Sequence, residues 1–238
     1  MNKIKFALKE LCITDKNIIP SSLYNQSVKC YTEYCIIKSK GRVEVMGKVF
    51  WNGGTLLSPM PAVLVTCADG EKKNVFTVAW TGIINTKPPM TYISVRPSRY
   101  SYEIIKKTGE FAINLTTEKL CRAVDFCGVK SGKDIDKFEA CNLAVTDAKN
   151  ISVPILEESP LALECKVVDS KLLGTHEIFI AEIVGTVADE RYIDENGRLE
   201  LEKADLLAYS HGQYRGLGKN LGSFGFSVRK KKKKHKKK

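Results

Sequence analysis

The chain has 238 residues, 43% of them hydrophobic, which is enough for one substantial core, and a formal net charge of +11. Nine positive charges lie in residues 229–238 and a net four in residues 1–45, so residues 46–228 carry a net charge of −2. This distribution argues against a base-reading surface on the body of the protein. We expect residues 229–238 to be a disordered poly-lysine tail, with sequence-independent affinity for polyanions at most.

Cysteine spacing and hydropathy bear on the compartment and on metal binding. The eight cysteines include no C-x-x-C pair, and there are only three histidines, so we expect no metal site and reduced, buried thiols. The N-terminus has no clean apolar core of a signal peptide, and no apolar run approaches the roughly 20 residues of a membrane span. The sequence therefore predicts a cytoplasmic protein without membrane association.

Residues 1–45 differ in character from the rest. They contain a possible short strand, YCIIK, but few other periodic apolar positions. A more regular pattern of apolar residues begins at Met46, and we place a domain boundary there. Residues 1–45 are then an N-terminal extension of unknown role, and residues 46–228 form the main domain.

The next predicted elements are strands, a Pro-Pro loop and a helix. The strand-like runs are AVLVTC, VFTVAW and MTYISV. A loop separates the last two, since the residue before each proline is pushed out of the helical region. A helix is predicted from about Arg99 to Thr108, with Ser98 as its N-cap and Gly109 as its stop.

The second half continues mainly as strands. FAINL predicts a strand, and a helix follows on which Leu120, Ala123, Val124 and Cys127 share one face. KSGKDIDKF is a polar loop or short helix, and LALECKVVDSKLLG and EIFIAEIVGTVADERYI are two long strands. The glycine-rich stretch at 208–226 is predicted to be irregular. Many strands and few helices indicate a mainly β fold, a closed or partly closed antiparallel barrel with peripheral helices.

The segment RPSRYS carries the strongest indication of a ligand. It places Arg96, Ser98, Tyr100 and Ser101 around a helix start, where free N–H groups, the helix dipole, hydroxyls and a guanidinium favour a phosphate. The alternative is a surface turn with an ordinary capping serine.

The run TVAWTG could supply the other end of a nucleotide site. Thr77, Trp80 and Thr81 offer hydroxyls and an aromatic ring near the same sheet edge, although they could equally be ordinary barrel residues. Since side chains alternate along a strand, some contacts from this run would have to be made by the backbone.

Two further features are weaker. His176 and His211 are each possible proton donors or contacts for a pyridine nucleotide, or structural hydrogen-bonding residues. GLGKNLG at Gly216–Gly222 resembles a dinucleotide fingerprint, but its glycine spacing is wrong and no βαβ unit follows, so we expect no Rossmann site.

Taken together, these segments resemble the flavin reductase-like proteins of the FMN-binding split-barrel class, and most of all their flavoredoxin-type branch. The resemblance runs from Lys48 to Lys230 through NVFTVAWTG, PPMTYISVRPSRYSYEII, GEFAINLTTE, FCGVKSGKDIDKF, ESPLALECKVV, GTHEIFIAEIV and AYSHGQYRGLGKNLG. It implies a homodimer of split barrels, each subunit with one non-covalently bound FMN.

The resemblance also assigns residues. It places the phosphate-binding block on Arg96, Ser98, Arg99, Tyr100 and Ser101. It places the ring-contacting segment on Thr77, Val78, Ala79, Trp80 and Thr81. The family's Gly-Asp-His motif reads Gly174-Thr175-His176 here, which makes His176 the candidate catalytic residue and leaves direct use of NAD(P)H open.

Three functions follow as hypotheses. The first is an oxidoreductase that passes electrons from NAD(P)H or a protein donor through FMN to a redox partner protein or a small-molecule acceptor. The second is a non-catalytic FMN electron carrier, and the third is a polyanion-binding protein that uses the lysine tail.

Overall fold

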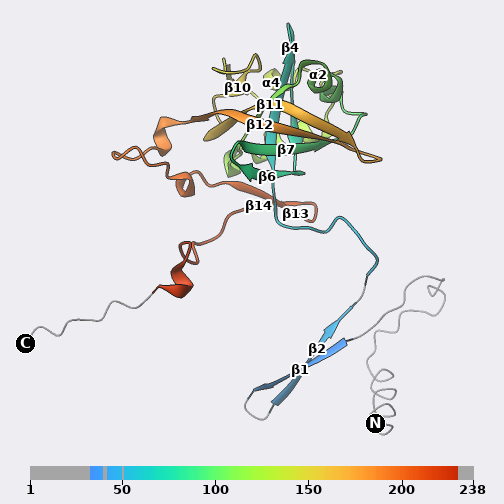
Figure 1. Cartoon of the computed structure of the whole chain (residues 1–238), viewed down its shortest axis with the longest axis vertical. Coiled ribbons are helices and arrows are strands. Elements are labelled where there is room, and N and C mark those ends of the chain that lie inside the picture. Colours follow the sequence, from blue (N-terminus) through green and yellow to red (C-terminus); the bar gives the residue numbers. More distant parts are fainter. Residues whose placement is uncertain (1–32, 40–41, 50, 230–238) are drawn as a thin grey trace, which may run out of the picture. The chain divides into compact units, whose positions relative to one another are not determined.

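The computed structural model describes residues 33–39, 42–49 and 51–229, and the chain divides into two compact units between Leu56 and Leu57 (Figure 1). In the first unit, β1 (Glu33–Ser39) pairs antiparallel with β2 (Arg42–Lys48), which confirms the strand expected in YCIIK. The boundary predicted at Met46 falls inside β2, and the role of the N-terminal extension stays a prediction. The lysine tail from residue 230 onward lies outside the described residues.

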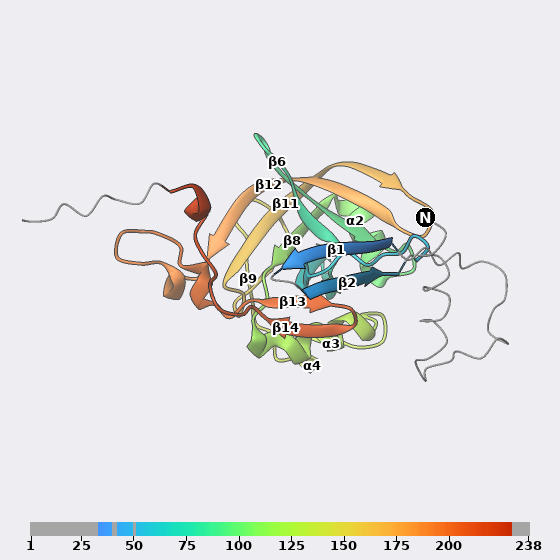
Figure 2. The same cartoon turned by 90° about the horizontal axis from the view of Figure 1, so that it is seen from below.

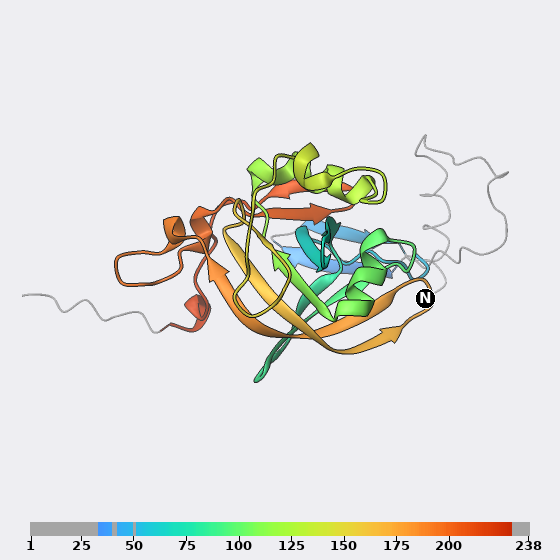
Figure 3. The same ribbon diagram turned by 90° about the horizontal axis from the view of Figure 1, so that it is seen from above.

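A seven-stranded sheet forms the centre of the second unit. Neighbouring strands in this sheet are all antiparallel. Their order is β5-β4-β8-β11-β12-β7-β6. The strands are β4 (Val63–Asp69), β5 (Lys72–Val78), β6 (Thr81–Thr86), β7 (Pro89–Val95), β8 (Glu110–Asn114), β11 (Leu161–Leu172) and β12 (Glu177–Ala188). Figures 2 and 3 show the long strands β11 and β12 curving round, so that the sheet wraps over its own inner face. The mainly β barrel fold with peripheral helices is confirmed.

The sheet is covered on both faces because its central strands are apolar on both sides. Val63 and Val65 of β4 point into the barrel, where they pack with Phe111 and with Ile105 of α2 (Tyr100–Thr108). Leu64, between them, faces outward.

The outward face is covered by two more helices and by a smaller, three-stranded sheet. They are α3 (Cys121–Val129) and α4 (Lys137–Ala140), of which α3 contributes Val124 and α4 contributes Phe138 to one outer cluster. The two helices thus hold their loop, residues 130–136, over the end of the sheet that carries β5.

A smaller sheet corrects one expectation. Residues 208–226 were predicted to be irregular, yet β13 (Leu207–Ser210) and β14 (Gln213–Gly216) form a hairpin that also pairs with β3 (Met60–Pro61). The turn consists of His211 and Gly212, at φ of 47° and 76°, the pair of left-handed residues that a two-residue hairpin needs. Residues 217–223 form neither helix nor strand.

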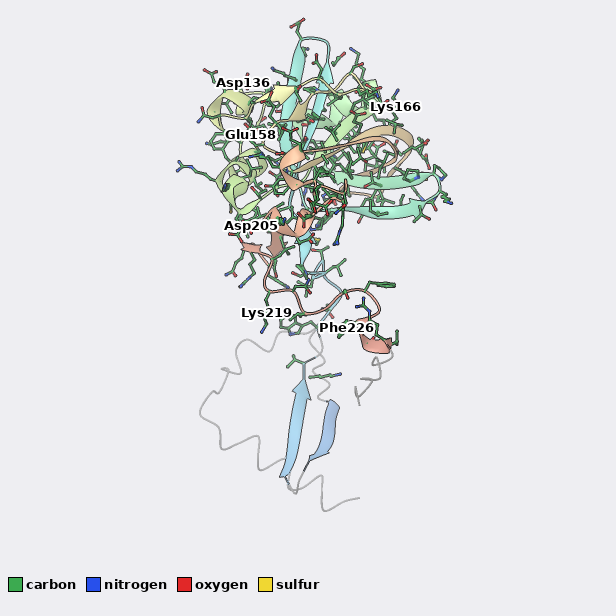
Figure 4. All side chains as sticks on the ribbon, turned by 90° about the vertical axis from the view of Figure 1, so that its left-hand side faces the viewer. Asp136, Glu158, Lys166, Asp205, Lys219 and Phe226 are labelled. Carbon is green, nitrogen blue, oxygen red and sulfur yellow. The ribbon has the colours of Figure 1, made fainter. Side chains whose placement is uncertain are left out.

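The remaining elements are short. They are β9 (Val145–Thr146), β10 (Ile155–Leu156) and the 3₁₀ turns η2 (Glu118–Leu120), η3 (Glu190–Tyr192), η4 (Leu201–Lys203) and η5 (Phe226–Val228). Beyond β14 the chain runs through Lys219 to Phe226, both labelled in Figure 4, along a segment with many exposed apolar side chains. None of the described helices has the length and apolarity to cross a membrane.

The cysteines described in the second unit behave as small apolar side chains. Cys67, Cys127 and Cys165 are buried and free, and burial raises their pKa to about 11, 12 and 12. Thiols with such pKa values are protonated at neutral pH. The expectation of buried thiols holds for these three, whereas Cys121 and Cys141 are half-buried.

Candidate functional site

The loop between β7 and α2 forms the base of the site. Its backbone closes a turn in which the N–H of Arg99 donates to the carbonyl of Arg96 at 2.9 Å. The structure corrects the predicted cap: Arg99, not Ser98, occupies the N-cap of α2, and no side chain bonds the first-turn N–H groups. The N–H of Tyr102 donates to the carbonyl of Arg99 at 2.9 Å, which leaves the N–H groups of Tyr100 and Ser101 for an anion, as the predicted phosphate site requires. The stop at Gly109 is confirmed by its left-handed φ of 68°.

A cavity of about 390 Å³, here called the polar cavity, opens in front of this loop. All five residues of the predicted phosphate-binding block line it: Arg96, Ser98, Arg99, Tyr100 and Ser101. Segments remote in sequence complete the wall, namely Asn74 of β5 and the loop from Val129 to Gly132. The cavity thus gathers cationic and hydroxyl groups at a helix start.

Ser101 is held from behind by β5. Its side chain is buried, and the Asn74 amide donates to its hydroxyl oxygen at 2.7 Å. A hydroxyl that accepts this bond keeps its own proton for another acceptor. Asn74 therefore leaves Ser101 able to act as a donor.

A second cavity, of about 510 Å³ and here called the aromatic cavity, is lined by rings from separate elements. Trp80, after β5, and His176, before β12, stack with ring centroids 4.5 Å apart and an angle of 33°. Tyr209 and Tyr214 of the β13–β14 hairpin also line it, with centroids 5.5 Å apart. Planar walls of this kind suit a flat ligand.

The structure brings four of the five residues of the predicted ring-contacting segment to one cavity. Thr77, Val78, Ala79 and Trp80 line the aromatic cavity. Thr81 lines neither cavity; its hydroxyl donates to the carbonyl of Tyr92 and so joins β6 to β7.

The two cavities are adjacent and share part of their wall. Both are lined by Phe76, Arg96, Arg99 and Val129. Arg99 is fixed at this junction, since its guanidinium donates to the carbonyl of Gly128 at 2.8 Å. One elongated site therefore has a cationic end and an aromatic end, which fits a ligand with a phosphate on one side and a planar ring on the other.

Two titratable groups of the aromatic end, His176 and Tyr214, have pKa values shifted toward the neutral form. Burial lowers the pKa of His176, and the positive charge of Arg96 lowers it further. Burial raises the pKa of Tyr214 to about 12, and the carboxyl group of Asp125 adds to that shift. His176 is thus a neutral imidazole at neutral pH, and the hydroxyl of Thr175 lies 2.9 Å from its Nδ1.

Several lining residues were missed from the sequence. They are Asn74, Asp125, Lys137, Tyr209 and Tyr214. The segment KSGKDIDKF belongs to the resemblance and could have pointed to Lys137, but no local pattern connects it with RPSRYS. His211 was one of two histidine candidates; its neighbour Gly212 lines the aromatic cavity, whereas His211 itself does not.

Gly132 yields a testable prediction about how the polar cavity is held. A Cβ at residue 132 would overlap the Asn74 side chain, which is buried and bonded to Ser101. We expect Gly132→Ala to lower the free energy of unfolding by about 1–3 kcal/mol, the usual effect of overpacking. Urea denaturation measures this.

The matched control is Gly218→Ala, because a Cβ there meets no atom within 4 Å. An unchanged stability of Gly132→Ala, equal to that of the control, would contradict the close packing of Gly132 on Asn74.

Comparison with known proteins identifies a family model and a similar solved structure. The family model "Flavin reductase like domain" matches residues 56–218. The structure resembles flavoredoxin of Desulfovibrio vulgaris (Miyazaki F), with a TM-score of 0.70, 27% identity, and coverage of 76% of this chain and 100% of that chain.

The relatives found by sequence include an uncharacterized protein and a named flavin enzyme. An uncharacterized protein of Pyrococcus abyssi is 29% identical over 158 residues, 66% of this chain and 89% of the relative. A more distant relative, an NADPH-flavin oxidoreductase of Streptomyces viridifaciens, is 25% identical over 151 residues, 62% of this chain and 77% of the relative.

Proposed function

The chain belongs to the flavin reductase-like family, with the flavin-binding split-barrel fold, and from this premise we propose that it is an FMN-dependent oxidoreductase. In this proposal electrons pass from NAD(P)H or a protein donor to a partner protein or a small-molecule acceptor. The observation that carries the proposal is that a cationic cavity and an aromatic cavity lie side by side and share part of their wall.

The polar cavity suits the FMN phosphate. Arg96 and Arg99 supply guanidinium groups, and the start of α2 supplies free N–H groups. Ser98 and Ser101 add hydroxyl donors, of which Ser101 is oriented by Asn74. These groups would hold FMN without a covalent bond.

The aromatic cavity suits the isoalloxazine ring. Thr77, Val78, Ala79 and Trp80 would line one side of the ring, and the backbone of this segment can bond its polar edge. Bound FMN would supply the redox chemistry, while the protein positions it and excludes water.

His176 is proposed to contact the second reactant at the exposed side of the ring. Its stacking on Trp80 fixes the imidazole at the wall of the aromatic cavity. Thr175 replaces the aspartate of the family motif, so the imidazole has a hydroxyl neighbour in place of a carboxylate. Burial and the positive charge of Arg96 lower the pKa of the imidazole and favour its neutral form, so we assign it the role of a hydrogen-bonding contact.

We also propose a homodimer. In β6 of the β6–β7 hairpin, Ile83 and Ile84 are 65% and 47% exposed. The segment after β14 exposes Leu221 and Phe224. Apolar side chains of this kind are covered in interfaces between copies. A cytoplasmic location stays a prediction.

An absorbance spectrum of the purified full-length protein tests the function. We expect the visible bands of a bound flavin, and their bleaching when NADH or NADPH is added without oxygen. A colourless protein that takes up no FMN would contradict the proposal. Flavin bands that neither nucleotide bleaches, with free flavin supplied, would favour the electron carrier instead.

A further inference from the structure

Residues 220–229, here called the apolar turn, are held together by hydrogen bonds within the segment itself. The N–H of Phe226 donates to the carbonyl of Ser223 at 2.9 Å, and the N–H of Val228 donates to the carbonyl of Gly225 at 3.3 Å. Among the described residues, no hydrogen bond joins this segment to the barrel. The apolar turn is therefore a local structure of its own, which follows the smaller sheet along the chain.

The apolar turn exposes its apolar side chains. Phe226 and Val228 are 60% and 81% exposed, and neither belongs to a hydrophobic cluster of the core. The ring of Phe226 packs on Gly222 of the same turn, where an added Cβ would come 2.6 Å from a ring carbon. The homodimer proposed above would cover Leu221 and Phe224, which leaves Phe226 and Val228 for another partner.

Positive charge follows directly on this apolar pair. Arg229 and the eight lysines of residues 230–238 supply nine positive charges. The guanidinium of Arg229 donates to the hydroxyl of Ser223 at 2.8 Å, so the first of these charges belongs to the apolar turn. Among the described residues, no carboxylate pairs with Arg229 or with Lys219, which precedes the turn. Charges of one sign without an internal counter-ion attract a polyanionic surface.

The apolar pair distinguishes between the two large polyanions that fit this charge. Nucleic acid gains affinity by stacking its bases on aromatic rings or guanidinium planes, but a valine and a run of lysines offer no such flat face. A membrane with anionic headgroups accepts both kinds of contact: the lysines lie near the headgroup charge, while Phe226 and Val228 enter the boundary with the acyl chains. Either contact alone is weak and reversible, and the two together attach a protein stably.

We propose that residues 226–238 attach the protein to the surface of membranes that contain anionic phospholipids, with Phe226 and Val228 inserted and the lysines at the headgroups. Residues 46–228 carry a net charge of −2 and add no attraction of their own, so attachment depends on this segment. The proposal departs from the expectation of no membrane association, which considered only spanning segments and a signal peptide. It is independent of the proposed function, since none of the described residues of this segment lines either cavity.

Sedimentation of the full-length protein with lipid vesicles tests the proposal. We expect it to bind vesicles of phosphatidylcholine that contain about 30% phosphatidylserine, because each basic residue near an anionic surface raises the affinity about fivefold. Vesicles of phosphatidylcholine alone should bind it at least about a hundredfold more weakly. Added salt should release the protein from the anionic vesicles, since it screens the charges.

Replacing Phe226 and Val228 together by alanine isolates the apolar contact. This double variant should bind the anionic vesicles about tenfold more weakly, because two apolar side chains no longer leave water at the membrane. Its affinity for single-stranded poly(U) should stay within about twofold of the wild type, since every positive charge is kept. The matched control is Leu172→Ala with Leu173→Ala, a similarly exposed apolar pair at the β11–β12 turn, which should bind vesicles as the wild type does.

Two results would overturn the proposal. Binding of poly(U) without binding of anionic vesicles would make the segment a nucleic-acid contact. Equal vesicle affinity of the wild type and the apolar double variant would exclude insertion, and a shift of that variant from dimer to monomer in ultracentrifugation would assign the pair to a second copy of the chain. Neither result touches the flavin spectrum, so failure of this proposal is distinguishable from failure of the proposed function.

Discussion

Replacing Arg96 and Ser98 together by alanine is expected to raise the Kd for FMN at least about a hundredfold. The double variant removes one guanidinium and one hydroxyl from the polar cavity, and both reach it from the β7–α2 loop. A charge-assisted hydrogen bond contributes about 1.5–3 kcal/mol and a neutral one about 1 kcal/mol, and each 1.4 kcal/mol is a factor of ten in Kd. Fluorescence titration of the flavin-free protein measures the change.

His176→Ala is the comparison for this double variant. His176 lines only the aromatic cavity, so its loss should change FMN retention much less. Riboflavin binding should weaken much less than FMN binding in the double variant, because riboflavin has no phosphate to lose contacts with and Arg96 is only part of the wall of the aromatic cavity. Equal FMN retention by the wild type, the double variant and His176→Ala would overturn the phosphate assignment.

Glu177→Gln is expected to lower the free energy of unfolding by about 1–3 kcal/mol at neutral pH, the cost of weakening hydrogen bonds to a buried charge. The Glu177 carboxylate is 3% exposed and bonds both Tyr102 and Lys106 of α2. Lys106 is 47% exposed, so water solvates its ammonium group in the variant, and this keeps the loss of stability moderate. Glu177 also pairs with Val95, and thus joins α2 to the end of β7 and the start of β12.

The pH dependence of stability gives this prediction a second test. The ammonium group of Lys106 and the hydroxyl of Tyr102 lower the pKa of Glu177 from 4.5 to about 2. The unfolded chain therefore takes up this proton first as the pH falls, so the contribution of Glu177 is complete above about pH 4.5 and is lost as the pH falls toward 2. Urea denaturation over this range should show the wild type and Glu177→Gln converging in stability.

Glu103→Gln is the matched control, an exposed carboxylate on the same helix. It should change stability by less than about 0.5 kcal/mol, as most surface substitutions do. A constant difference between wild type and Glu177→Gln down to pH 2 would show that the carboxylate does not stabilise the fold through its charge.

Much of the fold could be predicted because strand patterns are local. Alternation in MTYISV and the long apolar runs after residue 161 indicate strands whatever surrounds them, and Gly109 has the residue type that a helix stop needs. The hairpin at residues 207–216 was missed because His211 occupies a left-handed position that asparagine or glycine usually takes. The cap of α2 was missed because Arg99 makes no capping bond with its side chain.

The sequence by itself determined the split between a nearly neutral body and a lysine-rich end, the mainly β character, and the loop that carries Arg96 to Ser101. Those features depend on composition, on period-two patterning and on residues within one turn of each other. Only the tertiary structure decided that Asn74 lies behind Ser101, that Lys137 enters the same cavity, and that Trp80 stacks on His176. These contacts join residues 27 to 96 positions apart along the chain, and packing of separate elements brings them together, which no local pattern records.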